Sequence, residues 1–540
     1  MKKASRIVAL LMALIMVLGT LAACTEGSTT EAPKTTEGGN TTKPTGTAGP
    51  ADTAEKLEIS DELKAAIADR RFDGEQIGIV VSGGSFATRS IAVDKEADDY
   101  DPNYSVNVAV EKRNTIVQDE LGVKINPEKT VSMQAMIEYM RNHFSAPTVD
   151  LDIVGVYQYF DIGLAFGDFN GSFYNYNALT ETGDNFINID APYWDKETYE
   201  TLEWEGAAYW LTGDLSQMWL SSTFVSFVNA DIWKDYEKKI EEYTGYKDIY
   251  ELVYAGKWTL DLILWLNDTV HLNRDGNESK VSLQDQHGFL TYTAATGINS
   301  IVVDALFSGC HITWTKMNEE GKPEISFYNK NLQAYAEATY KLYNQSKTCL
   351  IDYNSQTGDQ VVNRFADGNT LVTLNILSDA ETYLGDMEDD YYILPLPKLN
   401  EKQKNYATTL GDGVTQFGIP TTCTTPAAAT ATLELLGFYS YKEVTPVYYD
   451  EVLKGRYVRG DSDAAAEMID FIRTTIYADF ALIWSGTLES YSGTDSPSWF
   501  MRYKIGQKTM ATQGISKEKA WQSGLEELLL ELEISGSQID

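Results

Sequence analysis

The chain contains 540 residues, more than the ~100–200 residues of a typical domain, so two or more structural units are expected. Hydrophobic residues make up 43% of the chain and charged residues 23%, as in ordinary globular proteins. This composition excludes general disorder, a collagen and a disulfide-dense scaffold. Acidic residues outnumber basic ones by 79 to 43, and the net charge of −36 repels phosphate backbones, which argues against nucleic acid as a partner.

The first 23 residues predict a secretory signal. Lys2, Lys3 and Arg6 precede an uncharged apolar run at residues 7–18, which is too short to cross the ~30 Å hydrocarbon core of a bilayer. The run ends in Leu-Ala-Ala-Cys at residues 21–24, which resembles the lipobox of bacterial lipoproteins. The resemblance implies cleavage before Cys24 and acylation of Cys24, with palmitate as one expected acyl group. It also implies anchoring on the extracellular face of the cell membrane. The alternative is an ordinary signal peptide with an incidental cysteine.

Residues 24–56 predict a disordered tether between this anchor and a folded body. After Cys24 the segment contains ten threonines, several glycines and prolines, and no large apolar or aromatic side chain. Such a composition has nothing to bury and does not form a core. No later stretch holds 18 consecutive apolar residues, so no further membrane span is expected.

The body begins with a strand, helix and strand pattern. Residues 76–81 form a short apolar run that ends in the turn Ser-Gly-Gly-Ser at 82–85, as in a buried parallel strand. Residues 133–144 carry apolar side chains at helical spacing, and a second apolar strand is expected at 151–156. This order predicts a βαβ unit and an open α/β sheet.

The same alternation continues along the chain. Thr259 is expected to cap the helix that follows it, and two prolines make residues 393–397 an extended edge or crossover segment. From residue 427 to the end, helices dominate. The remaining predicted elements are strands at 207–212, 224–229 and 416–419 and helices at 110–121, 233–243, 260–266 and 332–343.

Known catalytic motifs are absent from the sequence. The four histidines, His143, His271, His287 and His311, do not form an H-E-x-x-H pair, and neither a G-x-S-x-G elbow nor a phosphate-binding loop occurs. Paired carboxylates cannot be identified, because among 79 acidic residues some pair always lies at the separation that glycosidases use. We therefore predict no catalytic residue and no cofactor.

No metal site is predicted either. Cys310, Cys349 and Cys423 lack C-x-x-C spacing, so three buried thiols, or at most one disulfide, are expected. Residues 273–277 resemble half of a calcium-binding loop. That frame places His271 and Ser282 at ligand positions, and neither suits calcium. A plain Asp-Gly turn is the better interpretation.

Aromatic residues are the remaining functional signal. They make up 12% of the chain, and sugar sites pair flat aromatic surfaces with hydrogen-bonding side chains. Any single aromatic residue is more often part of a core, but the set favours a carbohydrate cleft. Five aromatic residues lie close together in the sequence, beside Asp214: Trp194, Trp204, Tyr209, Trp210 and Trp219.

With these segments in view, nearly the whole chain resembles the substrate-binding lipoproteins of ABC importers, specifically extracellular solute-binding protein family 1. Each matching piece is short, and their order and spacing together carry the resemblance. Besides the lipobox at Cys24, the matching segments are YWLTGD at 209–214, VSFVN at 225–229, GKWTLD at 256–261, DQHG at 285–288, RFADG at 364–368, LPLPK at 394–398, QFGIP at 416–420, ELL at 434–436 and EMIDFI at 467–472.

The resemblance implies a type II, periplasmic-binding-protein-like fold with two α/β lobes, a hinge of crossing segments and a ligand cleft between the lobes. The first lobe is expected to combine segments 57–226 and 419–457, and the second lobe segments 227–418 and 458–540. Crossing segments are expected near 227–230, 411–418 and 456–463. Ligand binding would favour closure of the lobes, and the closed protein would deliver its ligand to ABC permease subunits.

The resemblance also suggests ligand contacts. Ser85 lies in the turn after the first strand, Tyr157 and Tyr159 follow a later strand, and the other candidates lie before the first crossing or in the second lobe. Because these positions include no basic cluster, a neutral oligosaccharide is expected rather than an acidic one. The remaining candidates are Trp210, Asp214, Tyr292, Asn375 and Trp484.

Two alternative functions stay open at this point. One is a binding protein for a peptide or another solute, and the other is a lipoprotein glycoside hydrolase with two catalytic carboxylates. A purely structural lipoprotein fits the sequence least well. The leading prediction is a monomeric, lipid-anchored sugar receptor that contacts a small-molecule ligand, permease subunits and the membrane.

Overall fold

The computed structural model describes most of the chain beyond the predicted tether. The described residues are 57–83, 89–93, 95, 100–127, 131–147, 150–158, 161–165, 169–277, 282, 284–291, 301–346, 350–351, 358–411, 413–449, 462–484, 488 and 497–537. All of them belong to one of the two units into which the chain divides, Gly38–Asp540. Cys24 and the predicted signal and tether lie outside the described residues.

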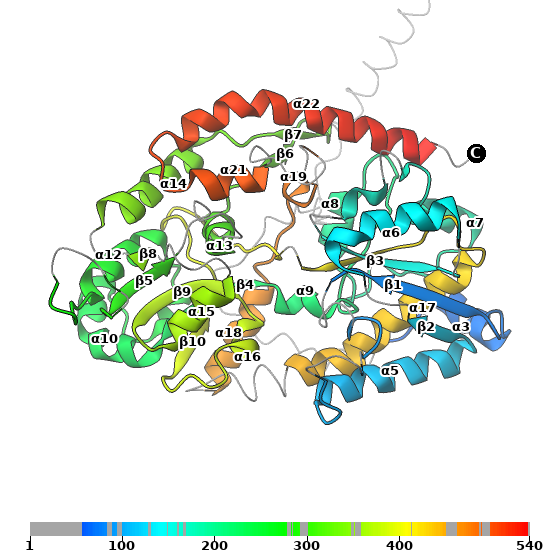
Figure 1. Cartoon of the computed structure of the whole chain (residues 1–540), viewed down its shortest axis with the longest axis horizontal. Helices are drawn as coiled ribbons and strands as arrows, with labels where there is room; N and C mark the ends of the chain where they lie inside the picture. The colour runs from blue at the N-terminus through cyan, green and yellow to red at the C-terminus, as the bar shows by residue number, and fades with distance from the viewer. Residues whose placement is uncertain are drawn as a thin grey trace, which may run out of the picture. The chain divides into compact units, whose positions relative to one another are not determined.

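The first lobe is built on a sheet of four strands (Figure 1). Its order is β2 (Lys124–Pro127), β1 (Gln76–Val81), β3 (Ile153–Tyr157) and β11 (Thr415–Gly418). β1 is parallel to β2 and β3, whereas β11 comes from much later in the chain and runs antiparallel to β3. The two apolar runs predicted as parallel strands are therefore confirmed as neighbours in one sheet.

Helices cover this sheet, and their buried faces follow the sequence pattern. In α6 (Met133–Ser145), the helix predicted from apolar spacing, Met136 and Met140 are fully buried. α5 (Ser105–Leu121) ends at Gly122, whose left-handed backbone provides the C-cap. The other helical segments of this lobe are α3 (Asp61–Ala68), η1 (Ile162–Ala165), α7 (Tyr176–Thr182), α8 (Lys196–Leu202), α17 (Pro426–Tyr439) and η5 (Ser440–Val444). The short helix α9 (Gln217–Ser221) belongs to the segment by which the chain leaves this lobe.

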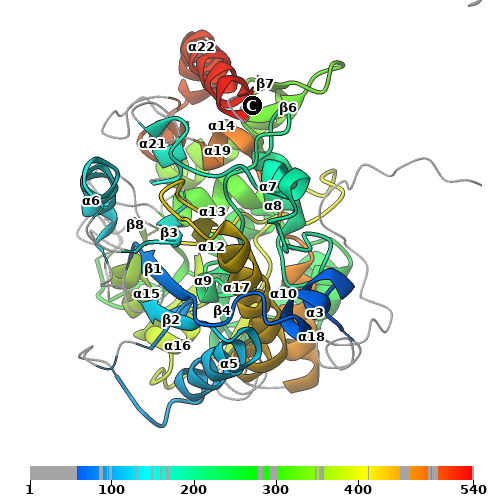
Figure 2. The ribbon, with the colours of Figure 1, turned by 90° about the vertical axis from the view of Figure 1, so that its right-hand side faces the viewer.

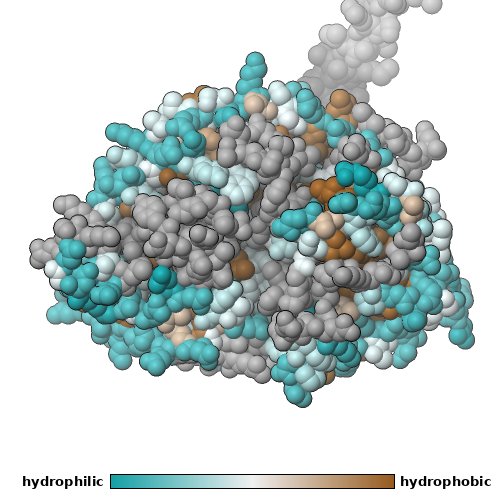
Figure 3. All heavy atoms as spheres, in the orientation of Figure 1, coloured by the Kyte–Doolittle hydropathy of each residue, from teal (hydrophilic) through white to brown (hydrophobic). Residues whose placement is uncertain are grey.

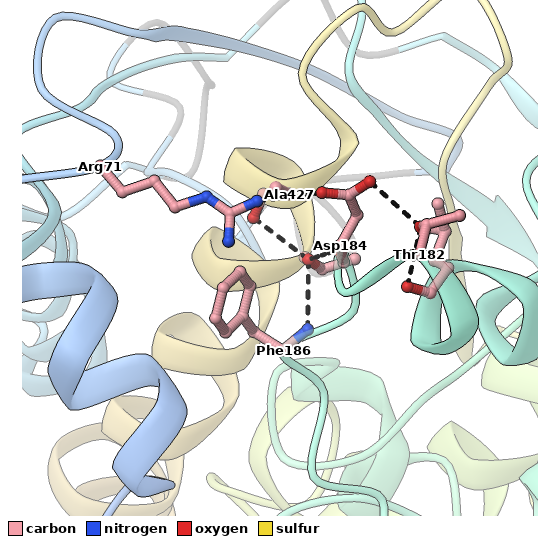
Figure 4. Close-up of polar contacts among 7 residues, drawn as sticks. Arg71, Thr182, Asp184, Phe186 and Ala427 are labelled. Atoms are coloured by element: carbon pink, nitrogen blue, oxygen red, sulfur yellow. Dashed lines mark hydrogen bonds and ion pairs between the residues drawn. The ribbon is translucent and has the colours of Figure 1, made fainter.

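The late helix α17 is fixed to the early part of the lobe by a polar network (Figure 4). The Thr430 hydroxyl donates to the Asp184 carbonyl at 2.6 Å and accepts from the Phe186 amide at 3.3 Å. The Asp184 carboxylate pairs with the Arg71 guanidinium at 3.0 Å, and its other oxygen accepts from the Thr182 hydroxyl. Segments that are far apart in the sequence are thereby held in one lobe.

The second lobe contains a five-stranded mixed sheet. Its order is β10 (Tyr391–Leu394), β4 (Phe224–Asn229), β9 (Thr370–Ile376), β5 (His287–Thr291) and β8 (Leu350–Ile351). β4 is antiparallel to both β9 and β10, while β5 is parallel to β9 and β8. β10 lies at the edge of the sheet, immediately before the two prolines that predicted an edge or crossover segment.

Helices and a small hairpin complete the second lobe. Thr259 accepts a hydrogen bond from the Leu262 amide and caps α12, as its sequence position predicts. The long C-terminal helix α22 can be followed in red in Figure 1. The elements are α10 (Ala230–Thr244), α11 (Ile249–Tyr254), α12 (Leu260–Val270), α13 (Ile301–Gly309), β6 (Thr315–Met317), β7 (Pro323–Ile325), α14 (Lys330–Tyr340), η4 (Lys341–Gln345), α15 (Gly358–Ala366), α16 (Asp379–Thr382), α18 (Ser462–Arg473), α19 (Phe480–Ile483), α21 (Pro497–Lys504) and α22 (Met510–Ser537).

Two crossing segments connect the sheets within the described residues. The chain leaves the first lobe after Gly213 and enters β4 at Phe224, then returns between Leu410 and β11. The two segments run side by side, because the Gly411 amide donates to the Ser222 carbonyl at 2.9 Å and Thr223 bridges Leu410. We call the described residues 214–223, 410–411 and 413–414, with the strand ends next to them, the junction. A further connection, between η5 and α18, passes through residues 450–461, which lie outside the described residues.

The predicted two-lobe α/β fold is confirmed, and several details differ. The crossing expected at 227–230 falls inside β4 and the start of α10, so the chain crosses earlier, at 214–223. β11 belongs to the first sheet, although the expected boundary placed it in the second lobe. The crossing expected at 456–463 falls mainly outside the described residues. Residues 207–212 form single bridges, such as Leu211 to Phe417, instead of a strand, because this stretch has no continuous partner.

Other features of the described residues bear on the sequence interpretation. Cys310 and Cys423 are buried free thiols, and Cys349 lies outside the described residues. The Asp275–Gly276 segment forms a turn in which the Gly276 amide donates to Asn273, with the positive φ of 78° that favours glycine. Among the described helices, none has the length and apolarity needed to cross a membrane. On the face drawn in Figure 3, the described surface is mainly hydrophilic, as the acidic composition suggests.

Candidate functional site

The strand directions of both sheets point to the junction. β3 ends at Tyr157 opposite Thr415, immediately after the second crossing segment, so the carboxyl ends of parallel β1, β2 and β3 lie on this side of their sheet. In the second lobe, β9 ends at Ile376 opposite Phe224, immediately after the first crossing segment. In open α/β sheets, ligands bind outside the carboxyl ends of the strands. The junction is therefore the candidate functional site.

Buried polar groups gather at the end of the first sheet. The Ser82 hydroxyl, directly after β1, donates to Asp161 Oδ2 at 3.0 Å and accepts from the Tyr157 amide at 3.0 Å. Asp161 is almost fully buried, and this burial raises the pKa of its carboxyl to about 7, against the opposing hydrogen bond from Ser82. Beside them, the side-chain nitrogen Nε2 of Gln416 donates to Gln158 Oε1 at 2.7 Å. These contacts fix the ends of β1, β3 and β11 to one another.

A buried ion pair ties the first crossing segment to the second lobe. Arg473, the last residue of α18, donates to Asp214 Oδ1 at 3.1 Å, and the Asp214 side chain is only 2% exposed. Burial raises the pKa of Asp214, and the positive charge of Arg473 opposes that shift. The guanidinium also lies over the ring of Trp219, 4.8 Å from its centroid, and the Trp219 indole donates to Asp195. The charge of Arg473 is thus matched by an adjacent carboxylate.

Several buried side-chain atoms along the crossing segments lack a hydrogen-bond partner among the protein groups. Such atoms are costly to bury and are usually satisfied by water or by a ligand. They belong to hydroxyl and amide groups, which both donate and accept hydrogen bonds and carry no charge. They comprise both polar atoms of the Gln217 side chain, Ser222 Oγ, Thr223 Oγ1, Thr415 Oγ1 and Gln416 Oε1.

Three of the eight predicted ligand contacts lie at the junction. Tyr157 is half-buried at the end of β3, Asp214 begins the first crossing segment, and Asn375 lies near the end of β9 with 1% exposure. The Asn375 side chain accepts from the Ile376 amide, so part of its polar capacity is used locally. Whether these side chains contact a ligand stays a prediction.

Two further candidates lie in apolar interiors. Trp210 is 1% exposed, packs against Phe173 and donates its indole N–H to the Ile162 carbonyl at 3.0 Å. Trp484 is also 1% exposed and packs against Phe480. In this conformation neither ring offers surface to a ligand, because each fills part of a core. Ser85, Tyr159 and Tyr292 lie outside the described residues.

Sequence reasoning did not single out Ser82, Asp161, Gln217 or Arg473. Ser82 belongs to the predicted turn, so its position directly after a strand was the one available signal. The ion pair joins residues 259 positions apart, and the burial of Asp161 depends on three-dimensional packing. Within the described residues, no group of three or more His, Cys, Asp or Glu side chains is arranged to hold a metal ion.

No protein-family model matches the chain, and no curated protein sequence matches it either. Solved structures match most of its length. An ABC substrate-binding protein from Listeria monocytogenes in complex with cycloalternan is 13% identical, covers 84% of this chain and 98% of its own, and has a TM-score of 0.47. Maltose-bound MalE3 from T. maritima is 14% identical, with coverages of 84% and 98% and a TM-score of 0.46. The galacto-N-biose-/lacto-N-biose I-binding protein of an ABC transporter from Bifidobacterium longum, in complex with lacto-N-biose, is 10% identical, with coverages of 85% and 97% and a TM-score of 0.47. At these identities the likeness concerns the fold alone.

Proposed function

We propose that the chain is the lipid-anchored, extracellular substrate-binding protein of an ABC importer and that it binds a neutral carbohydrate at the junction. The observation that carries this proposal is the convergence of both sheets on the junction, with the carboxyl ends of β1 and β3 on one side and that of β9 on the other. A ligand held there touches both lobes at once, so binding favours their closure.

The chemistry of the junction supports a hydroxyl-rich, uncharged ligand. The atoms without partners are the hydroxyls of Ser222, Thr223 and Thr415, the side-chain amide of Gln217 and the side-chain oxygen of Gln416. They are buried in this arrangement, so a ligand reaches them only when the lobes move apart. Such groups match sugar hydroxyls, which both donate and accept hydrogen bonds. The positive charge of Arg473 is already paired with Asp214, which disfavours an acidic sugar as the ligand. The half-buried ring of Tyr157 is the aromatic surface that we expect the sugar to contact.

A glycoside hydrolase is the less favoured alternative. Asp161 and Asp214 are buried carboxyl groups at the junction whose pKa values are raised, as a catalytic acid requires. Each is engaged, however: Asp161 accepts from Ser82, and Asp214 pairs with Arg473. A receptor that binds its ligand and delivers it intact to a permease needs no such acid. A peptide or another neutral solute is the second alternative ligand.

Thermal unfolding of the soluble Cys24→Ser protein across a panel of mono- and oligosaccharides tests the ligand class. A ligand present at 100 times its Kd adds about 2.7 kcal/mol to the stability of the folded state, which gives a measurable upward shift of Tm. We expect a shift with one class of neutral glycan and recovery of that glycan intact. Cleavage products would favour the hydrolase. No shift with any sugar, together with a shift in a peptide panel, would replace the carbohydrate by a peptide.

Labelling of the producing cells with radioactive palmitate tests the anchor. We expect the wild-type protein to incorporate label and to partition with membranes. The Cys24→Ser variant should remain unlabelled and appear in the soluble extracellular fraction. Equal labelling of both proteins would contradict acylation at Cys24. A wild-type protein that neither incorporates palmitate nor partitions with membranes would point to an ordinary signal peptide.

A further inference from the structure

A hydrogen bond joins the two lobes next to the first crossing segment, between residues that do not belong to it. The Tyr104 hydroxyl donates to Glu381 Oε1 at 2.7 Å, and both side chains are half-buried. Tyr104 is the residue before α5 in the first lobe, and Glu381 lies in α16 of the second lobe (Figure 1 and Figure 2). The guanidinium of Arg89 lies over the Tyr104 ring, 5.2 Å from its centroid, and helps to hold the ring in place.

The positions of these residues relate the contact to the candidate site. Tyr104 ends the stretch that links the carboxyl end of β1 to α5, and Glu381 follows shortly after the carboxyl end of β9. The same strand ends face the junction. Neither Tyr104 nor Glu381 lies on a crossing segment, so rotation about those segments would separate the two side chains. The Asp214–Arg473 pair differs, because Asp214 itself begins the first crossing segment.

The surroundings favour a neutral phenol that donates to a carboxylate. Burial raises the pKa of Tyr104, and the negative charge of Glu381 raises it further, so the hydroxyl keeps its proton at neutral pH. Hydrogen bonds to a charged acceptor are stronger than those between neutral groups, and partial burial protects this one from water. Both partners belong to the protein, so the bond does not depend on a ligand.

We propose that the arrangement of the lobes in this structure, in which Tyr104 and Glu381 meet, is a closed one, and that their hydrogen bond is an interlobe latch that presets it. A closed arrangement that is already populated lowers the free energy that ligand binding must supply for closure, and so raises apparent affinity. Loss of one such bond should shift the ratio of closed to open molecules about tenfold. The latch is a property of the two lobes and holds whatever solute the junction accepts.

The test measures the distance between the lobes in the full chain without ligand. Spin labels are placed at the exposed residues Glu138 on α6 and Glu242 on α10, in a background of Cys24→Ser and Cys349→Ser, and pulsed electron resonance gives the distance distribution. Cys310 and Cys423 are buried and can stay. We expect Tyr104→Phe and Glu381→Leu to shift the closed-to-open ratio about tenfold toward longer distances. Glu381→Gln keeps an acceptor oxygen but loses its charge, so its shift should lie between those of wild type and Glu381→Leu.

The matched control is Tyr439→Phe. Its hydroxyl also donates to a glutamate, Glu120, at 2.6 Å, but both residues belong to the first lobe. This variant should leave the distance distribution unchanged. A Tyr104→Phe/Glu381→Leu double variant should shift the ratio by less than the sum of the two single variants, because both remove the same bond. Unchanged distances in Tyr104→Phe, or additive shifts in the double variant, would overturn the latch. Because no ligand is used, these results are independent of the proposed function.

Discussion

Two buried carboxylates show how differently the interior of the first lobe and the junction are held. Inside the lobe, Glu434 accepts hydrogen bonds from the Tyr193 hydroxyl, from the Trp194 indole at 2.9 Å and from the Asn188 amide at 3.1 Å. At the junction, Asp214 pairs with Arg473 through a single carboxylate oxygen, and nearby hydroxyl and amide atoms have no partner among the protein groups.

The difference indicates which part of the molecule is costly to rearrange, the lobe interior, and which part is not, the junction. The satisfied network around Glu434, which joins distant segments, makes that part of the lobe interior costly to disturb. The junction instead depends on a few polar links, and its unpartnered atoms gain hydrogen bonds whenever water or a ligand reaches them. We therefore expect each lobe to move as a unit and the relative position of the lobes to change at small free-energy cost. Substitutions in the two regions test this contrast, from the largest expected effect to the smallest.

Replacement of Glu434 by alanine should be the most disruptive change. It leaves the Tyr193 and Trp194 donors buried without an acceptor and removes the acceptor of the Asn188 amide, which should lower the free energy of unfolding by about 3–5 kcal/mol. Urea unfolding measures the loss. The control is Glu120→Ala, which removes an exposed carboxylate of the same lobe and should cost less than ~0.5 kcal/mol. Equal losses in both variants would contradict the special role of the interior network.

Asp161 should make stability depend on pH at the end of the first sheet. Its pKa lies near 7 in the folded protein against an ordinary value of 3.8, so the folded state binds the proton more tightly than the unfolded state. Protonation of Asp161 therefore stabilises the folded state fully below about pH 4, and this stabilisation is lost as the pH rises through about 7. Asp161→Asn should remove this dependence, a difference on the order of 2–4 kcal/mol between pH 4 and pH 8. Parallel pH profiles of ΔG for wild type and variant would contradict the raised pKa.

Much of the fold could be predicted from the sequence because local signals agreed with the final packing. The apolar run of β1, the helical stripe of α6 and the Thr259 cap are each determined by neighbouring residues. The pairing of β11 with β3 could not be predicted, since it joins segments that are distant in the sequence. The first crossing was expected too late in the chain. β4 is buried throughout, and its apolar sequence does not indicate which of the two sheets it enters.

The site was less accessible to sequence reasoning than the fold. The family resemblance suggested Trp210 and Trp484 as ligand contacts, and both rings are buried in the structure, because a ring that stacks on a sugar and a ring that fills a core have the same sequence signature. Tyr157, proposed because it follows a strand, and Asn375, proposed from the resemblance, both lie at the junction, and their contact with a ligand stays a prediction. Groups such as Arg473 become relevant only through a partner that is distant in sequence.

Removal of Arg473 should cost less than removal of Glu434 but affect the junction directly. Arg473→Met leaves the Asp214 carboxylate buried without its cation, and we expect a loss of about 2–3 kcal/mol, since the Arg473 side chain keeps 19% exposure. Asp214→Asn/Arg473→Met should recover part of that loss, because the unpaired charge is gone. Chemical unfolding of the four proteins gives the coupling. A double variant that loses the sum of both single effects would show that the pair does not interact.

The smallest change in the free energy of unfolding should come from breaking an ion pair that differs from Asp214–Arg473 mainly in its exposure to solvent. Lys196 contacts Asp190 at the surface of the first lobe, where the two side chains are 49% and 73% exposed. Water and salt screen such a pair, so Lys196→Met should leave the free energy of unfolding almost unchanged, and added salt should abolish any remaining difference. The loss in Arg473→Met should persist in salt, because burial protects Asp214 from screening. If salt erased the effects of both substitutions equally, burial would not distinguish the ion pair at the junction from the one at the surface. The Asp214–Arg473 pair could then not help to set the position of the lobes.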